Sequence, residues 1–448
     1  MILGGVVSCR IAVFGTGYLG ATHAACMAQL GHEVVGVDVD EAKLESLAAG
    51  EAPFFEPGLN DVLKTNVDAG RVRFTSSYAE AAEFADIHFI AVATPQKRGE
   101  FVADLTFVDS VITTLAPLLK RPAVIYGKST VPVGTAARLS RLAQHMAPIG
   151  GGVEVAWNPE FLREGYAVQD TLHPDRIVLG IDSQHKGRAE DIARLVYADI
   201  IGEGVPFLVT DRETAELVKV AANAFLATKI SFINAMAEVC EAAGADVLEL
   251  ADAIGYDTRI GRRFLNAGIG FGGGCLPKDI RAFMARAGEL GANEAANFLR
   301  EVDSINLRRR GKMVELTKDI AGGSLIGTRI AVLGAAFKPD SDDTRDSPAL
   351  DIAGQIQLQG ASVTVYDPKA ISNASRAFPT LDYASSVRDA CDGADVTLVL
   401  TEWEEFRHLE PADLGSIVRN WRIIDGRNCL DQDRWRSAGW VYRGIGRR

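Results

Sequence analysis

The residue with the clearest potential for chemistry is Cys275, which follows a segment unusually rich in glycine. From Gly268 to Asp279 the chain reads GIGFGGGCLPKD, with five glycines ahead of the cysteine and a Lys278–Asp279 pair after it. Glycines lose much conformational freedom on folding, so a cluster of them indicates special backbone angles or a close approach by another group. A cysteine with a lowered thiol pKa or a neighbouring base is a nucleophile, whereas most lone cysteines are buried and inert. The segment is therefore either a flexible loop or a catalytic one.

A second chemical motif lies near the N-terminus. The chain reads GTGYLG at 15–20, a GxGxxG pattern that follows a hydrophobic strand and opens a helical stretch. In this setting the glycines allow a tight turn and let a pyrophosphate reach backbone N–H groups at the helix start. Asp38 ends the next strand and suits the adenosine ribose, which favours NAD over NADP, although Lys43 lies nearby. The residues assigned to this cofactor site are Gly15, Gly17, Tyr18, Leu19, Gly20, Asp38 and Lys43.

Together, the two motifs suggest an oxidation that passes through a covalent sulfur intermediate. A cysteine can capture an aldehyde as a thiohemiacetal, which becomes a thioester when its hydride passes to NAD, and water then releases the acid. Lys219 and Asn223 lie four residues apart on a predicted long helix. They therefore share one face of that helix, as two polar groups directed at one centre would.

These residues must be positioned by an α/β framework. Short runs rich in Val and Ile, such as RIAVFG and HEVVGVD, alternate with helical stretches up to Thr210, which predicts a parallel sheet covered by helices on both faces. The range 212–243 contains neither Gly nor Pro, Thr210 and Glu213 have capping-box spacing, and Gly244 is a natural stop. This pattern predicts a helix about 45 Å long. A second α/β rhythm begins after Thr328.

The predicted fold class is α/β, with two doubly wound Rossmann-like domains joined by a long central helix and a helical connector domain. The expected boundaries are 1–209 for the NAD-binding domain, 210–310 for the central helical domain and 311–448 for the second Rossmann-like domain. The second domain lacks the glycine fingerprint, because residues 334–338 read GAAFK. Its cations Lys338, Arg345 and Arg427 suit a phosphorylated ligand other than a dinucleotide, or else they are solvated surface residues.

Composition narrows the function classes. The chain has 448 residues and a mean hydropathy of +0.06, which is ordinary for two or three globular domains. Its net charge of -12 argues against a nucleic-acid partner or an anionic membrane surface. No apolar run is expected to reach transmembrane length, and the apolar start, interrupted by Arg10, predicts a short leader and a strand. Six scattered cysteines without metal-ligand spacing indicate a reducing cytoplasm and no metal site.

Several segments resemble those of the nucleotide-sugar 6-dehydrogenases, the UDP-glucose/GDP-mannose dehydrogenase family. Besides GFGGGCLPKD, they are KSTVPVGT (128–135), NPEFLREG (158–165), AELVKVAANAFLATKISFIN (215–234), RIGRRFLNAG (259–268) and AFKPDSDDTRDSPAL (336–350). The resemblance covers essentially the whole chain in the same order. The RIGRRFL segment and DGRN at 425–428 favour the UDP-glucose members over those acting on GDP-mannose or UDP-N-acetylmannosamine.

The resemblance implies roles for individual residues. The catalytic set would be Cys275 as the nucleophile, Asp279 and Thr130 holding a water, Glu160 as the acid/base partner of that water, and Lys219 and Asn223 at the oxyanion. Further residues near NAD would be Thr94, Thr130, Glu164, Lys278 and Arg345. Residues around the sugar nucleotide would be Phe161, Leu162, Glu164, Lys219, Asn223, Arg259, Phe264, Leu265, Gly272, Lys338 and Arg427, with Arg259 reaching the site of a neighbouring subunit.

The activity implied by the resemblance is an NAD-dependent, two-fold oxidation of the C6 hydroxyl of UDP-glucose to UDP-glucuronate, by a cytoplasmic homodimer formed through the central domain. One alternative is the same chemistry on GDP-mannose or UDP-N-acetylmannosamine. Another is a non-catalytic module that senses NAD and nucleotide sugars. A simple hydroxy-acid dehydrogenase would need neither the cysteine loop nor a third domain. The chain departs from many family members at Gly274, Leu276 and Ala235, where they have Ser, an aromatic residue and Glu.

Overall fold

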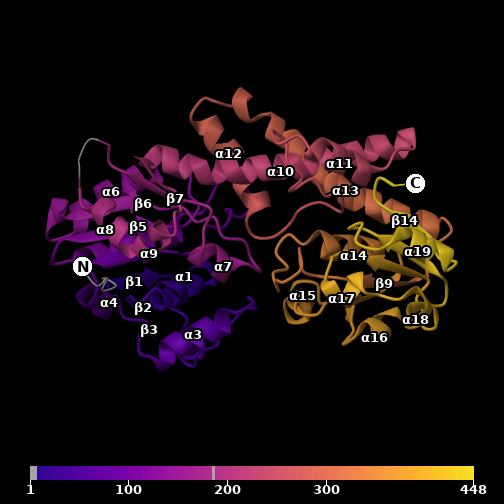
Figure 1. Ribbon diagram of the computed structural model, residues 1–448, viewed down its shortest axis with the longest axis horizontal. Coiled ribbons are helices and arrows are strands. Elements are labelled where there is room, and N and C mark those ends of the chain that lie inside the picture. Colours follow the sequence, from indigo (N-terminus) through magenta and orange to yellow (C-terminus); the bar gives the residue numbers. More distant parts are fainter. Residues whose placement is uncertain (1–7, 184–186, 448) are drawn as a thin grey trace. The chain divides into compact units, whose positions relative to one another are not determined.

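The structure is a computed structural model that describes residues 8–183 and 187–447, so most of the expected leader lies outside the described residues. The chain divides into two compact units (Figure 1). The first consists of Met1–Ala222 and Arg281–Glu289, and the second of Asn223–Ile280 and Leu290–Arg448. The three-domain boundaries expected from the sequence stay a prediction.

The first unit is built on an eight-stranded sheet in the order β3-β2-β1-β4-β5-β6-β7-β8. Its strands are β1 (Arg10–Phe14), β2 (Glu33–Val37), β3 (Val72–Thr75), β4 (Ile87–Ile90), β5 (Ala123–Gly127), β6 (Val153–Trp157), β7 (Ile177–Ile181) and β8 (Phe207–Asp211). The described strands pair in parallel except β6 and β7, which meet antiparallel at Trp157 and Gly180. The predicted parallel sheet is therefore a mixed one.

Both faces of this sheet are buried, which explains why its strands read as continuous apolar runs. In β1, Ile11 and Val13 belong to one core cluster, while Ala12 and Phe14 belong to the other. Helices cover the sheet: α1 (Tyr18–Gln29), α2 (Glu41–Ala48), α3 (Leu59–Asp68), α4 (Tyr78–Phe84), α5 (Thr106–Leu115), α6 (Thr135–Met146), α7 (Ala167–Leu172), α8 (Ala189–Val196) and α9 (Ala198–Gly202). Alternate residues of β1 thus pack on opposite faces of the sheet, and the predicted α/β class is confirmed.

The long helix α10 (Arg212–Ala243) has the bounds that the sequence predicts. Its start is capped differently, because the N–H of Thr214 donates to Asp211 Oδ1 at 2.6 Å. Asp211 therefore takes the capping role expected of Thr210. At the other end Gly244 has φ +71°, and the N–H of Ala245 donates to the Cys240 carbonyl at 2.9 Å, which is the bond pattern of a glycine-terminated helix.

The same helix corrects the expectation that no segment reaches transmembrane length. By length and composition alone α10 is long and apolar enough to cross a membrane, with a mean hydropathy of 1.3 over its most apolar window. Ala215 nevertheless lies in a core cluster of the first unit, and Ile233 and Ala237 lie in the core of the second. The polar Glu216 and Asn223 of this helix are buried as well. Packing inside each unit therefore accounts for part of its apolar composition, since 44% of that window is buried.

The second unit holds a parallel six-stranded sheet in the order β11-β10-β9-β12-β13-β14. Its strands are β9 (Arg329–Leu333), β10 (Ser362–Tyr366), β11 (Asp382–Tyr383), β12 (Val396–Val399), β13 (Arg422–Asp425) and β14 (Val441–Gly444). Its helices beyond α10 are α11 (Val247–Gly255), α13 (Phe298–Ile320), α14 (Pro348–Leu358), α15 (Ile371–Ala377), α16 (Val387–Cys391), α17 (Glu404–Arg407), α18 (Pro411–Gly415) and α19 (Gln432–Ser437), and α12 (Leu276–Glu289) begins in this unit. The second doubly wound domain predicted from the sequence is confirmed.

Glu216 on α10 binds the start of α6, and its carboxyl group has an unusually high pKa. Its carboxylate accepts the backbone N–H groups of Gly134 at 2.7 Å and Ala136 at 2.6 Å. Burial nevertheless outweighs these two bonds and raises the pKa of Glu216 from 4.5 to about 7. The folded state therefore keeps a proton that the unfolded state releases, so the free energy of unfolding should fall by up to roughly 3 kcal/mol as the pH rises from 4.5 to about 7.

Glu216→Gln should reduce this loss, because the amide carries no charge to be desolvated. We expect the fall in Tm between pH 5 and pH 8, measured by differential scanning fluorimetry, to shrink in this variant. The control is Glu45→Gln on α2, an exposed glutamate of the same unit, which should behave like the unaltered protein. An unchanged pH profile in Glu216→Gln would contradict the assignment.

Candidate active site

The loop between β1 and α1 is shaped by three glycines, each with its own structural reason. Gly15 has φ +88°, and a Cβ there would lie 2.7 Å from Val92 Cγ1. A Cβ on Gly20 would lie 1.7 Å from the Gly15 carbonyl oxygen, so only glycine lets the helix pack this closely on the strand. Gly17, the N-cap of α1, instead has no described atom within 4 Å of its Cβ position. Helix N–H groups beside such open backbone can bind a pyrophosphate, and this loop therefore fits a dinucleotide.

Asp38 lies at the end of β2, beside this loop. Its carboxylate accepts bonds from the Thr16 N–H at 2.8 Å, the Thr16 hydroxyl at 3.0 Å and Lys43 Nζ at 2.9 Å. Burial works against the carboxylate, but the bonds from Lys43 and Thr16 outweigh it and hold the pKa of Asp38 below its usual value. Asp38 is thus an anion held at the loop, where it can accept a ribose hydroxyl and repel a 2′-phosphate.

Asp38→Ala tests this arrangement. A hydrogen bond to a charged group contributes about 1.5–3 kcal/mol, so we expect the Kd for NAD to rise about 10- to 100-fold. The preference for NAD over NADP should fall at the same time, because Lys43 loses its carboxylate partner. Calorimetric titration with both cofactors measures these effects. Asp40→Asn, which keeps the acceptor that caps α2, is the control, and an unchanged NAD affinity in Asp38→Ala would refute the role.

Tyr18, expected near the cofactor, also contacts a residue that the sequence analysis missed. Its hydroxyl bonds to the buried carboxylate of Glu56. Glu56 in turn accepts the N–H groups of Gly165 and Ala167, each at 2.6 Å. The first residue of α1 and the loop that ends at Gly165 are therefore joined through one carboxylate. The sequence showed Glu56 only as a glutamate in a loop, with no spacing to indicate these partners.

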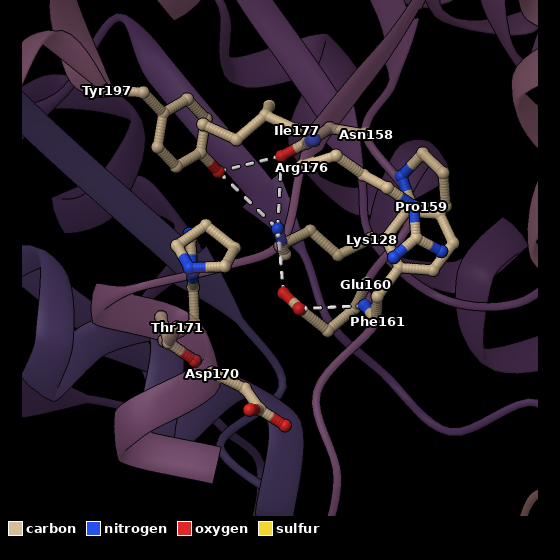
Figure 2. Close-up of a pocket in the computed structure, with 12 residues that line it drawn as sticks. Lys128, Asn158, Pro159, Glu160, Phe161, Asp170, Thr171, Arg176, Ile177 and Tyr197 are labelled. Atoms are coloured by element: carbon tan, nitrogen blue, oxygen red, sulfur yellow. Dashed lines mark hydrogen bonds and ion pairs between the residues drawn. The ribbon is translucent and has the colours of Figure 1, made fainter. Parts of the chain in front are cut away.

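Residues 158–161 line one side of a small cavity of about 30 Å³ in the first unit (Figure 2). Glu160 Oε2 lies 2.9 Å from Lys128 Nζ, and Glu160 Oε1 accepts the N–H groups of Phe161 at 2.8 Å and Leu162 at 3.1 Å. A carboxylate offers about four acceptor positions, so Glu160 keeps capacity for a further donor such as water. The structure thus brings Glu160, Phe161 and Leu162 together, and it adds Lys128 to the set expected from the sequence.

Two cations lie near the Phe161 ring. The Arg176 guanidinium carbon is 3.9 Å from the ring centroid, and Lys219 Nζ is 5.5 Å from it. Lys219 is thereby placed beside the loop 158–165.

Elsewhere in the first unit, the Thr94 hydroxyl donates to the Thr130 carbonyl at 2.8 Å. The two threonines expected at the cofactor and at the water are therefore in direct contact.

The glycine-rich loop of the second unit is built into its surroundings rather than flexible. The N–H of Gly268 donates to Asn234 Oδ1 at 2.9 Å, and the N–H of Gly273 donates to the Arg345 carbonyl at 2.9 Å. Asn306 on α13, which the sequence analysis missed, accepts the Phe271 N–H at 2.7 Å and donates to the Phe271 carbonyl at 2.9 Å.

Several of these glycines leave no room for a side chain. A Cβ on Gly272 would lie 2.3 Å from the Asp346 carbonyl oxygen, and one on Gly270 would lie 2.4 Å from Asn306 Oδ1, whereas one on Gly274 would meet only the movable end of the Arg345 side chain. The glycines therefore permit close backbone packing ahead of Cys275.

Cys275 is the N-cap of α12, because its carbonyl accepts the Asp279 N–H at 2.9 Å. The thiol is exposed and forms no disulfide. A helix N-terminus stabilises the negative charge of a thiolate. Burial, by contrast, raises the pKa of the Cys26 and Cys391 thiols to about 12. Cys275 therefore has the exposure and the helix terminus that a nucleophile needs, whereas Cys26 and Cys391 are buried core residues.

Asp279, in the first turn of α12, contacts two of the other expected residues. Its Oδ2 accepts Asn223 Nδ2 at 2.7 Å, and its Oδ1 lies 2.5 Å from Lys278 Nζ. Only 2% of the Asp279 side chain is exposed, so this carboxylate is held in one orientation. The structure thus brings Asn223, Lys278 and Asp279 together one turn from Cys275.

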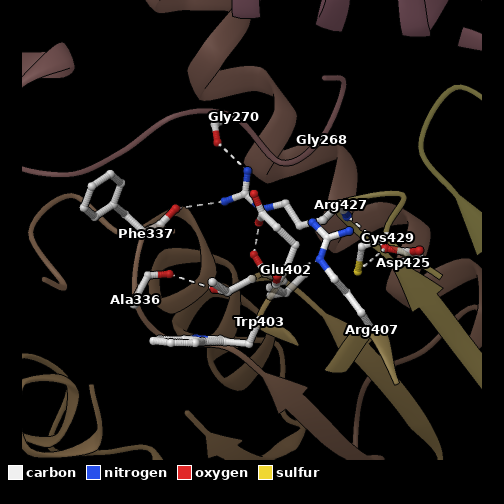
Figure 3. Close-up of polar contacts among 12 residues, drawn as sticks. Gly268, Gly270, Ala336, Phe337, Glu402, Trp403, Arg407, Asp425, Arg427 and Cys429 are labelled. Carbon is white, nitrogen blue, oxygen red and sulfur yellow. Dashed lines mark hydrogen bonds and ion pairs between the residues drawn. The ribbon is translucent and has the colours of Figure 1, made fainter. Parts of the chain in front are cut away.

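Arg427, expected at phosphates or sugar hydroxyls, is engaged by protein carbonyls in this structure (Figure 3). Its guanidinium donates to the carbonyls of Leu400 at 2.9 Å, Gly270 at 3.1 Å and Phe337 at 3.2 Å, and its Nε lies 3.3 Å from a Glu402 oxygen. Arg427 therefore connects the glycine-rich loop to the carboxyl edge of the second sheet.

The other expected ligand residues of the second unit are more dispersed. Lys338 Nζ lies 5.5 Å from the Phe337 ring centroid, and Arg345 forms a two-bond ion pair with Asp343. Arg259 pairs with Asp257, and its side chain is 87% exposed.

The segment before the glycine-rich loop contributes one exposed and one buried side chain. Phe264 has φ +66° and is partly exposed, while Leu265 is buried in the core. No cluster of His, Cys, Asp and Glu suited to a metal occurs among the described residues.

The fold and the loop at 15–20 define an α/β protein with a dinucleotide site, and comparison with known proteins identifies its family. Residues 9–201 match the NAD binding domain of the UDP-glucose/GDP-mannose dehydrogenase family, residues 213–308 its central domain and residues 331–432 its UDP binding domain. The chain belongs to the UDP-glucose/GDP-mannose dehydrogenase family. The resemblance seen in the sequence and the assignment of NAD are thereby confirmed.

Relatives match along the whole chain. A UDP-glucose 6-dehydrogenase of Rhizobium meliloti is 41% identical over 438 residues, which cover 98% of this chain and 99% of that protein. The solved structure of a UDP-glucose dehydrogenase from Pyrobaculum islandicum superposes with a TM-score of 0.90 at 35% identity and full coverage of both chains. The structure of a UDP-D-ManNAc dehydrogenase from Pyrococcus horikoshii gives a TM-score of 0.84 at 28% identity, covering 98% and 99% of the two chains.

Proposed function

We propose that this protein oxidises the C6 hydroxyl of UDP-glucose twice, to UDP-glucuronate, through a thioester on Cys275. The observation that carries the proposal is the exposed cysteine at the N-terminus of α12, with Asp279 one turn away and bonded to Asn223 and Lys278. A dehydrogenase that stopped at the aldehyde would have no use for this arrangement.

The reaction balances with the groups that the chain can hold. Bound NAD supplies the hydride acceptor for both oxidations, so that one UDP-glucose, one water and two NAD give one UDP-glucuronate, two NADH and three protons. Cys275 forms the C–S bond to the aldehyde carbon and is released when water cleaves the thioester. Covalent capture keeps the aldehyde on the protein between the two oxidations.

The remaining roles are those that the resemblance to the family implies. Lys219 and Asn223 stabilise the oxyanion, because an ammonium and an amide N–H are its natural donors. Asp279 and Thr130 hold the water, and Glu160 exchanges a proton with it. The loop from Phe161 to Glu164 is assigned to the sugar nucleotide, and so are Phe264, Leu265 and Gly272. Lys338 and Arg427 meet its phosphates or hydroxyls, and Lys278, Arg345, Thr94 and Glu164 lie near NAD.

UDP-glucose is proposed over other sugar nucleotides because the R. meliloti and P. islandicum relatives bear the name of its dehydrogenase. The test is kcat/KM, from NADH absorbance, with UDP-glucose, GDP-mannose and UDP-N-acetylmannosamine. We expect the highest value with UDP-glucose. A higher value with either other substrate would overturn the substrate assignment, and binding of NAD and sugar nucleotide without NADH formation would instead support a sensing module.

We further propose a cytoplasmic homodimer formed through the central helices. Three large apolar side chains of α10 are exposed at intervals of seven residues, Phe225 at 66%, Phe232 at 48% and Val239 at 56%. Seven-residue spacing places them on one face of the helix, which is suited to a second helix. In a dimer, Arg259 would be free to reach the site of the neighbouring subunit. The domain division at 209/210 and 310/311 belongs to the same proposal.

Phe225→Glu should convert the dimer to a monomer, because it replaces the most exposed of these three apolar side chains with a charge. Sedimentation velocity measures the change. Glu213→Gln, on the exposed first turn of the same helix, should leave the mass unaltered. A protein that is monomeric without substitution, or a Phe225→Glu variant that stays dimeric, would contradict the proposed interface.

A further inference from the structure

Lys128, to which no role has been assigned so far, is a buried cation whose three N–H donors each have an acceptor. Its side chain is 5% exposed, and Nζ contacts Glu160 Oε2 at 2.9 Å, Asn158 Oδ1 at 3.0 Å and the Tyr197 hydroxyl at 3.4 Å (Figure 2). An ammonium has three N–H donors, and here each has one acceptor. Burial alone lowers the pKa of Lys128, but Glu160 and Tyr197 outweigh it and raise this pKa above its usual value. Lys128 is thus a fixed positive charge.

The partners of Lys128 are themselves held. The Tyr197 hydroxyl donates to Asn158 Oδ1 at 2.7 Å, and Asn158 Nδ2 donates to the Val178 carbonyl in β7 at 2.8 Å. The ammonium therefore has little freedom to follow Glu160 if that side chain moves. The Glu160 carboxylate therefore takes a position that is fixed by the ammonium. The ammonium is itself fixed by β5, which precedes Lys128, and by β7.

Glu160 passes this constraint on to the backbone. Its second oxygen accepts the N–H groups of Phe161 and Leu162. One carboxylate therefore links the buried ammonium to the turn that begins the substrate loop. Loss of the ammonium would leave Glu160 largely buried, with 16% of its side chain exposed and no counter-charge, and a carboxylate in that state moves toward water.

We propose that Lys128 is a positioning residue, which holds the Glu160 carboxylate and the Phe161–Leu162 amides in the orientation needed for hydrolysis of the Cys275 thioester. This inference rests on the proposed function, since it requires the thioester. Lys128 acts through Glu160 and touches neither substrate nor cofactor in this assignment.

Lys128→Met removes the charge and keeps the length of the side chain. We expect kcat to fall about 100-fold, which is the cost of misplacing a catalytic group by about 1 Å. Because hydrolysis is the step affected, intact-mass spectrometry after mixing with UDP-glucose and NAD should show the acyl-enzyme. Lys120→Met, at an exposed lysine ahead of β5, is the matched control and should turn over normally without an adduct. Normal kcat in Lys128→Met, or slow turnover without an adduct, would overturn the proposal.

A double-mutant cycle separates positioning from an independent role. In a Glu160→Gln background, Lys128→Met should cost no further activity, because Lys128 then has no carboxylate to hold. Equal losses of kcat in both backgrounds would overturn the proposal. If Lys128→Met alone does not fold, kcat of Glu160→Gln is compared with kcat of the double variant, which buries no unpaired charge. Equal kcat values support the proposal, and a lower kcat in the double variant overturns it. Failure of the proposed function would look different, because the unaltered protein would then form no UDP-glucuronate.

Discussion

Cys275→Ser is expected to abolish turnover of UDP-glucose, with kcat lowered by about 10⁴-fold or more, the scale seen when an enzyme nucleophile is removed. A serine hydroxyl is not ionised at neutral pH, and the N-terminus of α12 stabilises a thiolate far better than it can generate an alkoxide. The oxygen ester of any product that did form would lack the activated C–S bond that water cleaves. Stopped-flow NADH formation and product analysis by chromatography measure the effect.

The control for this variant is Cys9→Ser, since Cys9 lies ahead of β1, away from the cysteine loop in the sequence. That variant should retain full activity. The proposed chemistry would be wrong if Cys275→Ser still produced two NADH for each UDP-glucose at the unaltered rate.

Asp279→Asn should give the second largest loss, with kcat about 10²- to 10³-fold lower and the KM for UDP-glucose little changed. The substitution is nearly isosteric. It removes the negative charge that pairs with Lys278, and it turns one of the two carboxylate oxygens, which contact Asn223 and Lys278, into an amide NH₂ group. A group that holds the attacking water in place contributes on this scale to catalysis. Steady-state kinetics resolve kcat from KM.

Glu289→Gln, at the exposed end of the same helix, is the matched control and should leave both constants unchanged. If Asp279→Asn raised KM and left kcat intact, Asp279 would serve binding and not the water.

Features determined by neighbouring residues could be predicted from the sequence. The GxGxxG loop needs only its own glycines and the next strand, and the structure shows why Gly15 and Gly20 tolerate no side chain. The ends of α10 follow from a stretch without Gly or Pro that stops at Gly244. The α/β class follows from strands apolar on both faces, as the division of β1 between two core clusters shows.

Features set by distant residues could not be predicted in this way. Glu56 meets Gly165 across 109 positions, and Lys128 meets Tyr197 across 69. Asn306 binds both the N–H and the carbonyl of Phe271, a pairing that no local pattern encodes. The antiparallel meeting of β6 and β7 likewise depends on the path of the chain between them. In each case tertiary packing decides, and the sequence showed only an ordinary polar residue or a strand.

Arg427 shows the limit of assigning a role from residue type. A cation at the carboxyl edge of a sheet suits a phosphate, yet here its guanidinium donates to three backbone carbonyls. Its proposed contact with the substrate therefore requires a bound ligand to compete with Leu400, Gly270 or Phe337 for those donors.

The measurement that tests the central claim most directly is the end-point stoichiometry of NADH formed for each UDP-glucose consumed, with the sugar product identified by mass spectrometry. A four-electron oxidation through a Cys275 thioester predicts two NADH and one UDP-glucuronate, with no free aldehyde. One NADH for each sugar nucleotide, with a released UDP-linked aldehyde as the product, would contradict it.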